Sequence, residues 1–520
     1  MTTVTTNHAF NAFSRHVEQT REWLSQRCDA AVGFSSAELL DRLAQYVVDR
    51  GLPSFAQAVQ TRRAAGEAPM PPEGTVLVCG AATMTVGSGA LSIARSNVLR
   101  LSVDFVVHWA YVLVAIVAGA VTARPLDAAV LVHDLSDSDT RVEGIDAAFV
   151  AFCRQGPITP LVNARRLFVS GTEGPSTDPS LIYCRYPLVS LVREGRRGVI
   201  GRSLLALRHL ALLVTYPLAV VRTPMLAVLG RELAYSAVAR ELDRQGAIDA
   251  IVHTCSSYRH QPVWARGLGR ARTHMVWYAQ NWRPLRKVEG DEASHFPTTR
   301  WIRADEHWVW TESFATFLRE VLTGTMHVVG PILFRLPSRL PPDPSRFVVL
   351  VFDVPAVSDA IMIDPNGEID NYFHPDRLCA FLRDIVSLKA PLEARLGRAV
   401  TIRLKMKRGY QPDYAREYYT FVDDLVARGE IELAEPRDNL FELVSTGTLA
   451  ISYPFTSAAY VAEAMQIPSI YYDATGLMVS QDFSARGCVA FARRPAELAE
   501  ALVQGLSPLA LSAGGAGVGP

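Results

Sequence analysis

Residues 448–475 read TLAISYPFTSAAYVAEAMQIPSIYYDAT and carry the strongest fold signal in the chain. The apolar run 448–453 predicts a buried strand, the loop 454–457 follows it, and residues 456–467 have the composition of a helix. Pro468 then opens a second apolar strand. Strand, short loop, helix and strand form the repeating unit of a parallel sheet covered by helices, so this stretch predicts an α/β fold.

The same alternation extends upstream to about residue 346. Expected strands lie at 346–357, 399–408, 431–435, 448–454 and 468–475, and expected helices at 374–397, 413–429, 439–447, 456–467 and 495–506. We interpret residues 336–505 as a Rossmann-like domain, a fold that binds ligands beyond the carboxyl ends of its strands. The small residues that dominate 506–520 predict a disordered tail.

An earlier alternation of strands and helices fills residues 73–335 and predicts a second Rossmann-like domain. Residues 75–82 are expected to be its first strand, and further strands are expected at 127–135, 248–255, 273–281, 306–311 and 327–329. Residues 1–72 have helical spacing, and a Pro-rich connector before residue 346 marks the domain boundary. A chain of 520 residues also exceeds the size of a single core, about 250–300 residues. We therefore expect two Rossmann-like domains facing a cleft.

Two apolar stretches raise the question of membrane contact. Residues 105–123 contain no Asp, Glu, Lys or Arg and reach the minimum length of a transmembrane helix, although a buried core helix explains them equally well. The apolar run 209–221 is too short to span, but it follows a cluster of arginines, namely Arg193, Arg196, Arg197, Arg202 and Arg208. This pattern favours peripheral contact with an anionic inner membrane, and a core helix with a solvated basic end is the alternative. We treat residues 100–235 as an apolar helical insertion.

Composition excludes several classes of protein. Lys and Arg total 52, as do Asp and Glu, so the chain has no overall charge with which to bind nucleic acid. Its seven cysteines are scattered and form no Cys-x-x-Cys pair, which favours reduced thiols in the cytosol. The polar N-terminal residues do not resemble a secretory signal, so we expect a cytoplasmic protein.

The loop of Pro454, Phe455, Thr456 and Ser457 is the first candidate site. In open parallel sheets ligands bind beyond the carboxyl ends of the strands, where the next helix begins. Two hydroxyl groups and the free N–H groups of a helix N-terminus favour a phosphate there. The alternative is that Thr456 or Ser457 only caps the helix.

The residues after this loop carry a family resemblance. Glu463-Ala464 and then Gln466-Ile467-Pro468 follow the loop, and the whole stretch from Asp438 to Gly476 resembles bacterial surface-polysaccharide biosynthesis proteins named for a Pro-Phe-Thr-Ser motif. It is similar more broadly to GT-B glycosyltransferases, although Gln466 stands where those have Gly and Thr456 where many are acidic. The resemblance implies the GT-B fold and transfer of a sugar from a nucleotide-sugar donor during assembly of a capsule, O-antigen or similar glycan. It also implies that Glu463 binds the donor ribose, with a helix-surface role as the alternative.

A basic cluster provides the second candidate site. Lys405, Lys407 and Arg408 lie at the carboxyl end of a predicted strand, where they can pair with phosphate groups. A solvated strand end is the alternative explanation. The combination also resembles transferases that use CMP-sugars, but the pair His374-Pro375 precedes a helix and does not stand at the matching place.

The catalytic base is sought in the N-terminal domain. An inverting transferase needs a carboxylate or His near the acceptor hydroxyl, and His253, Asp305 and Glu306 are the candidates. We expect no metal and no cofactor besides the nucleotide-sugar substrate, because basic groups and a helix N-terminus can neutralise the leaving phosphate. The expected partners are this donor and a glycan or lipid-linked acceptor. A non-catalytic assembly or export scaffold, or a nucleotide-sugar epimerase of similar fold, remains an alternative.

Overall fold

The computed structural model describes most of the chain. It covers residues 17–22, 24–25, 34–67, 72–87, 91–119, 128–133, 135, 140–141, 144–194, 199–254, 261–277, 301–319, 322–334, 346–357, 373–411, 414–435, 438–454, 456–476 and 489–513.

The N-terminal part combines helix α2 (Ser36–Ala64) with a small antiparallel sheet. Its strands are β1 (Val76–Cys79), β2 (Ala82–Val86) and β3 (Leu91–Ile93). The prediction that residues 75–82 begin the parallel sheet is therefore wrong. Gly80, with φ of 62°, closes a tight hairpin between β1 and β2, and alternate residues of β1 are exposed, as in a sheet with one solvated face.

The second sheet has seven strands, all paired in parallel, in the order β10-β9-β8-β7-β4-β5-β6. Its strands are β4 (Ala129–His133), β5 (Leu167–Ser170), β6 (Leu181–Cys184), β7 (Ile248–Thr254), β8 (Arg272–Val276), β9 (Glu306–Val309) and β10 (Thr325–Val328). The helices of this region are α3 (Arg95–Ala118), α5 (Ala147–Gln155), α6 (Thr159–Val162), α7 (Pro187–Glu194), α8 (Val199–Arg222), η1 (Pro224–Leu229), α9 (Gly230–Ala234), α10 (Ser236–Arg244), η2 (Val263–Ala265) and α11 (Glu312–Arg319). When the seven strands are numbered by their order in the chain, their order across the sheet from β6 to β10 is 3-2-1-4-5-6-7. This is the Rossmann order 3-2-1-4-5-6 with one strand added.

Residues 100–235 are not a helical insertion. They include β4, β5 and β6, which complete one half of the seven-stranded sheet. Both β5 and β6 have only four residues, too few for a strand period to stand out between longer apolar helices.

The third sheet has six parallel strands in the order β13-β12-β11-β14-β15-β16, which is again the Rossmann order 3-2-1-4-5-6. Its strands are β11 (Phe347–Phe352), β12 (Val400–Lys405), β13 (Glu432–Leu433), β14 (Leu449–Ser452), β15 (Ser469–Tyr472) and β16 (Val489–Ala492). Its helices are α12 (Pro375–Ser387), α13 (Lys389–Leu396), α14 (Arg416–Ala427), α15 (Leu440–Ser445), α16 (Ser457–Ala464) and α17 (Pro495–Ala513). The predicted α/β class with two Rossmann-like domains is confirmed.

Strand β11 shows why its sequence is apolar throughout. All six residues are buried, and alternate side chains join two hydrophobic clusters on opposite faces of the sheet. Helices α12, α14 and α17 contribute to one cluster, and α15 and α16 contribute to the other. Both faces are therefore covered, as in other parallel sheets.

Two local predictions in this domain need correction. The helix expected at 374–397 is divided into α12 and α13, because Pro391 has no N–H with which to continue the helical hydrogen bonds. The expected disordered tail begins too early, since α17 continues to Ala513; residues 514–520 lie outside the described part.

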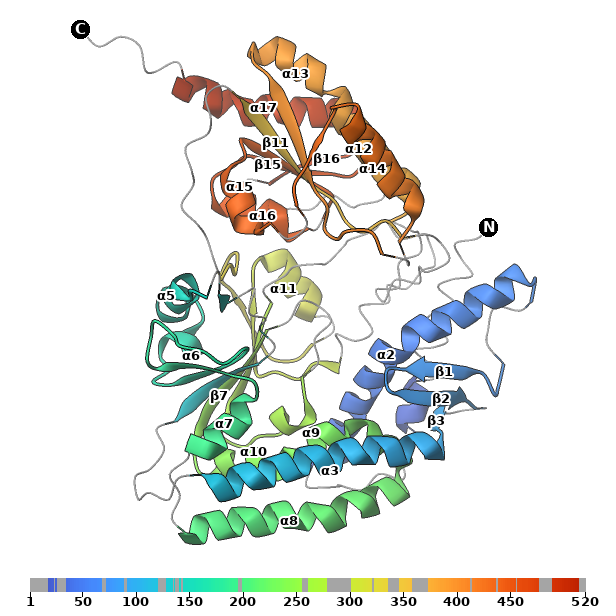
Figure 1. The fold of residues 1–520 in the computed structure, drawn as a ribbon, viewed down its shortest axis with the longest axis vertical. Helices are drawn as coiled ribbons and strands as arrows, with labels where there is room; N and C mark the ends of the chain where they lie inside the picture. The colour runs from blue at the N-terminus through green and yellow to red at the C-terminus, as the bar shows by residue number, and fades with distance from the viewer. Residues whose placement is uncertain are drawn as a thin grey trace.

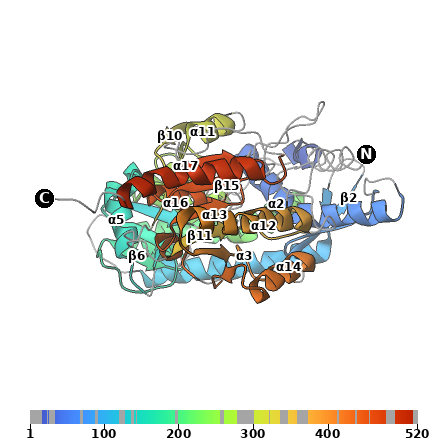
Figure 2. The same ribbon diagram turned by 90° about the horizontal axis from the view of Figure 1, so that it is seen from above.

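The two Rossmann-like domains lie one above the other along the long axis of the molecule (Figure 1). In the view from above, α12 and α17 lie in front of α3 (Figure 2). Trp310, which follows β9, packs edge-on against Tyr460 in α16, with ring centroids 4.8 Å apart. Because β9 ends at Val309 and α16 follows β14, the carboxyl edges of the two sheets meet at this contact.

Candidate active site

The carboxyl ends of β11 and β14 define the ligand-binding position of the C-terminal sheet. These neighbouring strands are connected to helices on opposite faces, so the strand order reverses between them. Ligands of doubly wound sheets bind outside the carboxyl ends at this switch point. Asp353 follows β11 and the loop 454–457 follows β14, so both stand at this position.

Thr456 has the environment of a ligand-binding residue. Its side chain is 7% exposed, and its Oγ1 has no hydrogen-bond partner among the described residues. Thr456 is the N-cap residue of α16, but its side chain makes no capping hydrogen bond. The hydroxyl is therefore free to bind a ligand rather than being used as a cap, and a buried hydroxyl without a partner is energetically costly.

The rest of this loop is arranged around the same helix N-terminus. Ser452, the last residue of β14, is fully buried and its Oγ also has no partner within the described part of the chain. Pro454 is buried and Ser457 is half-buried as the first residue of α16, whereas Phe455 lies outside the described residues. The Tyr471 hydroxyl donates a hydrogen bond of 2.9 Å to the Thr456 carbonyl oxygen and so fixes the loop backbone.

The basic cluster lies two strands away. Lys405 ends β12 opposite Phe352 of β11, and its Nζ donates to the Glu435 carbonyl oxygen at 3.3 Å. Burial lowers the pKa of Lys405. Lys407 and Arg408 are exposed. Since neighbouring strands are about 4.8 Å apart, the cluster and the Thr456 loop are separated by roughly 10 Å at the backbone.

Asp353, which was not among the predicted residues, follows β11 and so stands between these two regions. Its carboxylate accepts hydrogen bonds of 2.6 Å from the Lys407 backbone N–H and from the Tyr418 hydroxyl. Burial raises the pKa of Asp353 to about 7, although both hydrogen bonds act in the opposite direction. The sequence signal that could have identified Asp353 is an acidic residue directly after a six-residue apolar strand. A carboxyl group buried at such a position needs a specific hydrogen-bond partner.

Glu463 is not a helix-surface residue, because its side chain is only 3% exposed. It lies seven residues, or about two helical turns, after Thr456 and hence on the same side of α16. Its predicted contact with the donor ribose stays a prediction.

The switch point of the N-terminal sheet lies between β4 and β7, where His253 is buried. His133, the last residue of β4, pairs with it in register, and the two ring centroids are 5.6 Å apart. Sequence analysis missed His133, although it also ends an apolar run. The prediction of metal independence also overlooked the triplet Asp137-Ser138-Asp139, which has metal-ligand spacing and lies outside the described residues.

Asp305 and Glu306 are not brought together with His253. They lie at the amino end of β9, the opposite edge of the sheet from the switch point. The Asp305 carboxylate accepts a hydrogen bond of 2.7 Å from the Thr273 N–H, and Glu306 forms an ion pair of 3.2 Å with Arg272. Both side chains therefore connect β8 and β9, and their location does not fit the predicted catalytic role.

The sequence matches a family described as polysaccharide biosynthesis PFTS motif proteins over residues 210–502, more than half of the chain. The chain belongs to this family. The match covers the whole C-terminal sheet, the Thr456 loop and His253.

The chain is similar to several solved structures, all of them distant in sequence. Sucrose-phosphate synthase from Thermosynechococcus elongatus is 12% identical, with 75% of this chain and 91% of that one covered and a TM-score of 0.37. A glycosyltransferase from Rickettsia africae ESF-5 is 10% identical, with 74% and 89% covered and a TM-score of 0.38. The wall teichoic acid polymerase TagF is 10% identical, with 79% and 89% covered and a TM-score of 0.35.

No curated protein matches the sequence. The two Rossmann-like domains of this PFTS protein, meeting at the carboxyl edges of their sheets, have the GT-B arrangement that the sequence predicted.

Proposed function

We propose that this PFTS protein transfers a sugar from a nucleotide-sugar donor to a growing glycan during assembly of a cell-surface polysaccharide such as a capsule or O-antigen. The observation that carries the proposal is the buried Thr456 hydroxyl at the switch point of the C-terminal sheet, which has no partner among the residues that the structure describes. A phosphate bound there would accept hydrogen bonds from this hydroxyl and from the N-terminal N–H groups of α16.

The charges around this loop suit a departing phosphate. Lys407 and Arg408 are exposed, and Asp353 fixes the backbone from which they extend. Together with the N-terminus of α16, these cations would neutralise the negative charge that develops on the leaving nucleotide. We therefore propose a reaction that needs no metal ion.

His253 is the base in this proposal. The acceptor hydroxyl attacks the anomeric carbon of the donor sugar, and its proton passes to His253. The bond between the anomeric carbon and the phosphate oxygen breaks, and the nucleotide leaves with that electron pair. His133 lies against His253 and would orient its ring.

We place this reaction in the cytoplasm. Among the described residues Cys79, Cys153, Cys184 and Cys379 are free thiols, which supports a reducing compartment.

The test is a thermal-shift panel of UDP, GDP, CMP, dTDP and their sugars on the wild-type chain and on a Thr456→Ala/Ser457→Ala double variant. We expect one nucleotide class to raise the Tm of the wild type and to have no effect on the variant. Repeating the panel with EDTA and with Mg²⁺ tests metal independence, since a shift that requires Mg²⁺ would contradict it.

The alternatives give different results in this panel and in a transfer assay. A nucleotide-dependent shift with no sugar transfer to any acceptor would favour an assembly scaffold. Interconversion of the donor without an acceptor would favour an epimerase. The absence of a shift with every nucleotide would remove the basis of the proposal.

A further inference from the structure

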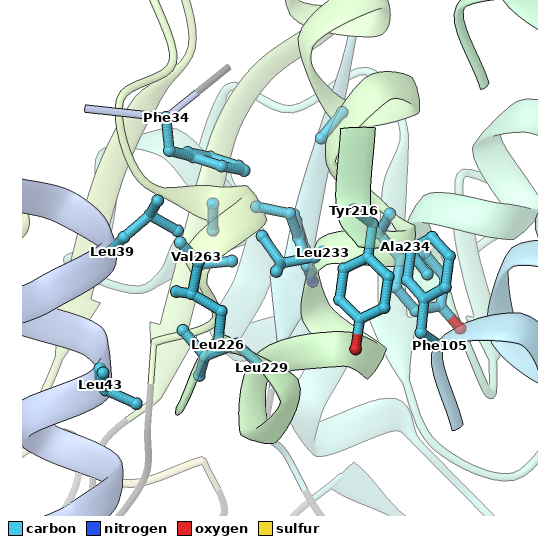
Figure 3. Packing of buried hydrophobic residues seen from close by; sticks show 14 of the residues in the cluster. Phe34, Leu39, Leu43, Phe105, Tyr216, Leu226, Leu229, Leu233, Ala234 and Val263 are labelled. Carbon is cyan, nitrogen blue, oxygen red and sulfur yellow. The ribbon is translucent and has the colours of Figure 1, made fainter. Parts of the chain in front are cut away.

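Helices α3 and α8 form an antiparallel pair at the end of the N-terminal domain that lies away from the C-terminal domain (Figure 1). The rings of Phe105 and Tyr216 stack with centroids 3.8 Å apart, and those of Trp109 and His209 stack at 5.4 Å. Figure 3 shows Phe105 and Tyr216 side by side in the core that continues to α9 and α2. The predicted apolar run 209–221 is thus part of a longer helix of 24 residues.

Polar groups of the pair are turned inward. The Trp109 indole N–H donates to the His209 carbonyl oxygen at 2.9 Å, and His209 Nε2 lies 2.8 Å from the Trp109 carbonyl oxygen. His108 Nδ1 lies 2.8 Å from the hydroxyl of Tyr235, the residue between α10 and α9, and α9 packs on the side of α3 that faces the protein. These three hydrogen bonds are made within the protein, which suits a surface that contacts an apolar medium.

The outer face of the pair is aliphatic. Six large aliphatic side chains on α3 and eight on α8 are 40–80% exposed, and the most exposed of each helix are Leu99 and Val117 on α3 and Ile200 and Val221 on α8. Both helices are long and apolar enough to cross a membrane, yet only 28% and 33% of their apolar windows are buried. A core helix would be mostly buried, so this alternative from the sequence analysis does not explain the face.

The charges at the rim of this face suit an anionic surface. The two helices contain five arginines (Arg95, Arg100, Arg202, Arg208 and Arg222) and a single acidic residue, Asp104. Arg208 is used in an ion pair with Glu241 on α10, and the other four lie toward the two ends of the pair. A long aliphatic face with arginines at its ends complements lipid tails and anionic headgroups.

The packing of the pair decides between crossing and lying in the membrane. At about 1.5 Å per residue each helix is roughly 36 Å long, enough to cross a bilayer. However, α3 packs along α7, η1 and α9, and α8 packs against η1 and α10. Crossing would bury in lipid the exposed charged residues that these elements carry, such as Glu194, Arg231 and Arg244, whereas lying flat would not.

We propose that α3 and α8 lie in the plane of an anionic membrane and insert their exposed aliphatic face between the lipids. This attachment is independent of the transfer reaction proposed above. The face would enter to the depth of the headgroup and acyl boundary, and the arginines at its ends would contact lipid phosphates.

The test is flotation of the purified full-length chain with vesicles of phosphatidylcholine alone or mixed with phosphatidylglycerol. The variant Leu207→Asp/Val214→Asp places two charges on the outer face, where both side chains are more than 60% exposed in the wild type. The matched control is Ile145→Asp/Val426→Asp, which charges two exposed aliphatic residues away from the pair. Circular dichroism and thermal unfolding serve to check that both variants keep the fold.

We expect the wild type and the control to float with anionic vesicles, and the outer-face variant to bind at least about tenfold more weakly. Binding should fall with added salt and on phosphatidylcholine alone. An outer-face variant that floats like the wild type would overturn the proposal. So would a wild type that binds no vesicles but sediments as a dimer that the outer-face variant dissociates, because the face would then join two copies of the chain.

Discussion

The Thr456 hydroxyl is buried without a partner among the described residues, whereas Thr448, also buried in the C-terminal domain, accepts a hydrogen bond of 3.2 Å from the Val348 N–H. We expect Thr456→Val to keep or raise the free energy of unfolding in urea but to weaken nucleotide binding roughly 10- to 100-fold, as for a hydrogen bond to a charged group. The matched Thr448→Val should destabilise by about 1–3 kcal/mol and leave binding unchanged. A loss of stability without a loss of binding at Thr456 would indicate a structural residue.

Asp353 should make the stability of the protein depend on pH. Its folded-state pKa is raised to about 7 by burial, so between pH 4 and 7 the folded state holds a proton that the unfolded state has released. Stability therefore falls by up to about 4 kcal/mol as pH rises through this window and is level above it. Asp353→Asn should flatten this slope in urea unfolding at pH 4.5, 6 and 7.5.

The exposed Asp423→Asn serves as the control for Asp353→Asn and should keep the wild-type slope. An Asp353→Asn profile parallel to that of the wild type would show that the carboxyl is ionised throughout this range.

At the scale of elements, the backbone at the end of α16 explains why the GT-B pattern usually has Gly at the position of Gln466. Gln466 takes the place of the usual Gly and has a φ of 58°, the left-handed region that favours Gly. We expect Gln466→Gly to stabilise the chain by about 0.5–1 kcal/mol in thermal or urea unfolding.

The reverse change serves as the control for this element. Gly397 ends α13 with φ of 61° and has open space around it, so Gly397→Ala should lose about as much stability as Gln466→Gly gains. If both substitutions were neutral, backbone conformation would not explain the usual Gly.

Strands that are largely apolar and have five to seven residues could be predicted from the sequence, because β4, β7 and β11 are long enough and buried enough to differ from their helices. The short strands β5 and β6 could not, and β1 was assigned to the wrong sheet because sequence spacing does not reveal strand partners.

The candidate site was predicted in part for the same reason. The Thr456 loop and the basic cluster carry local signals at strand ends, whereas Asp353 and His133 acquire their roles only through neighbouring strands that are distant in sequence. Asp305 and Glu306 were candidates because they are acidic and stand beside a predicted strand, and the structure places them at the amino end of β9.

At the scale of the whole molecule, two sheets of the same topology face each other at their carboxyl edges. Trp310 and Tyr460 join the carboxyl edge of the N-terminal sheet to the helix that begins at Thr456. His253 and Thr456 therefore lie at the facing edges of two different domains, which lets one domain hold a donor and the other an acceptor.

The helix pair adds a geometric consequence to this arrangement. The N-terminal domain carries the aliphatic face, and the C-terminal domain, which we propose binds the donor, lies at the other end of the long axis (Figure 1). Attached in this way, the enzyme would meet an acceptor whose diffusion is confined to two dimensions, while the small donor arrives from three. The enzyme would then reach the scarce, slowly moving polymer by lateral diffusion along the membrane. The activated sugar would reach the enzyme by diffusion through the solution next to the membrane.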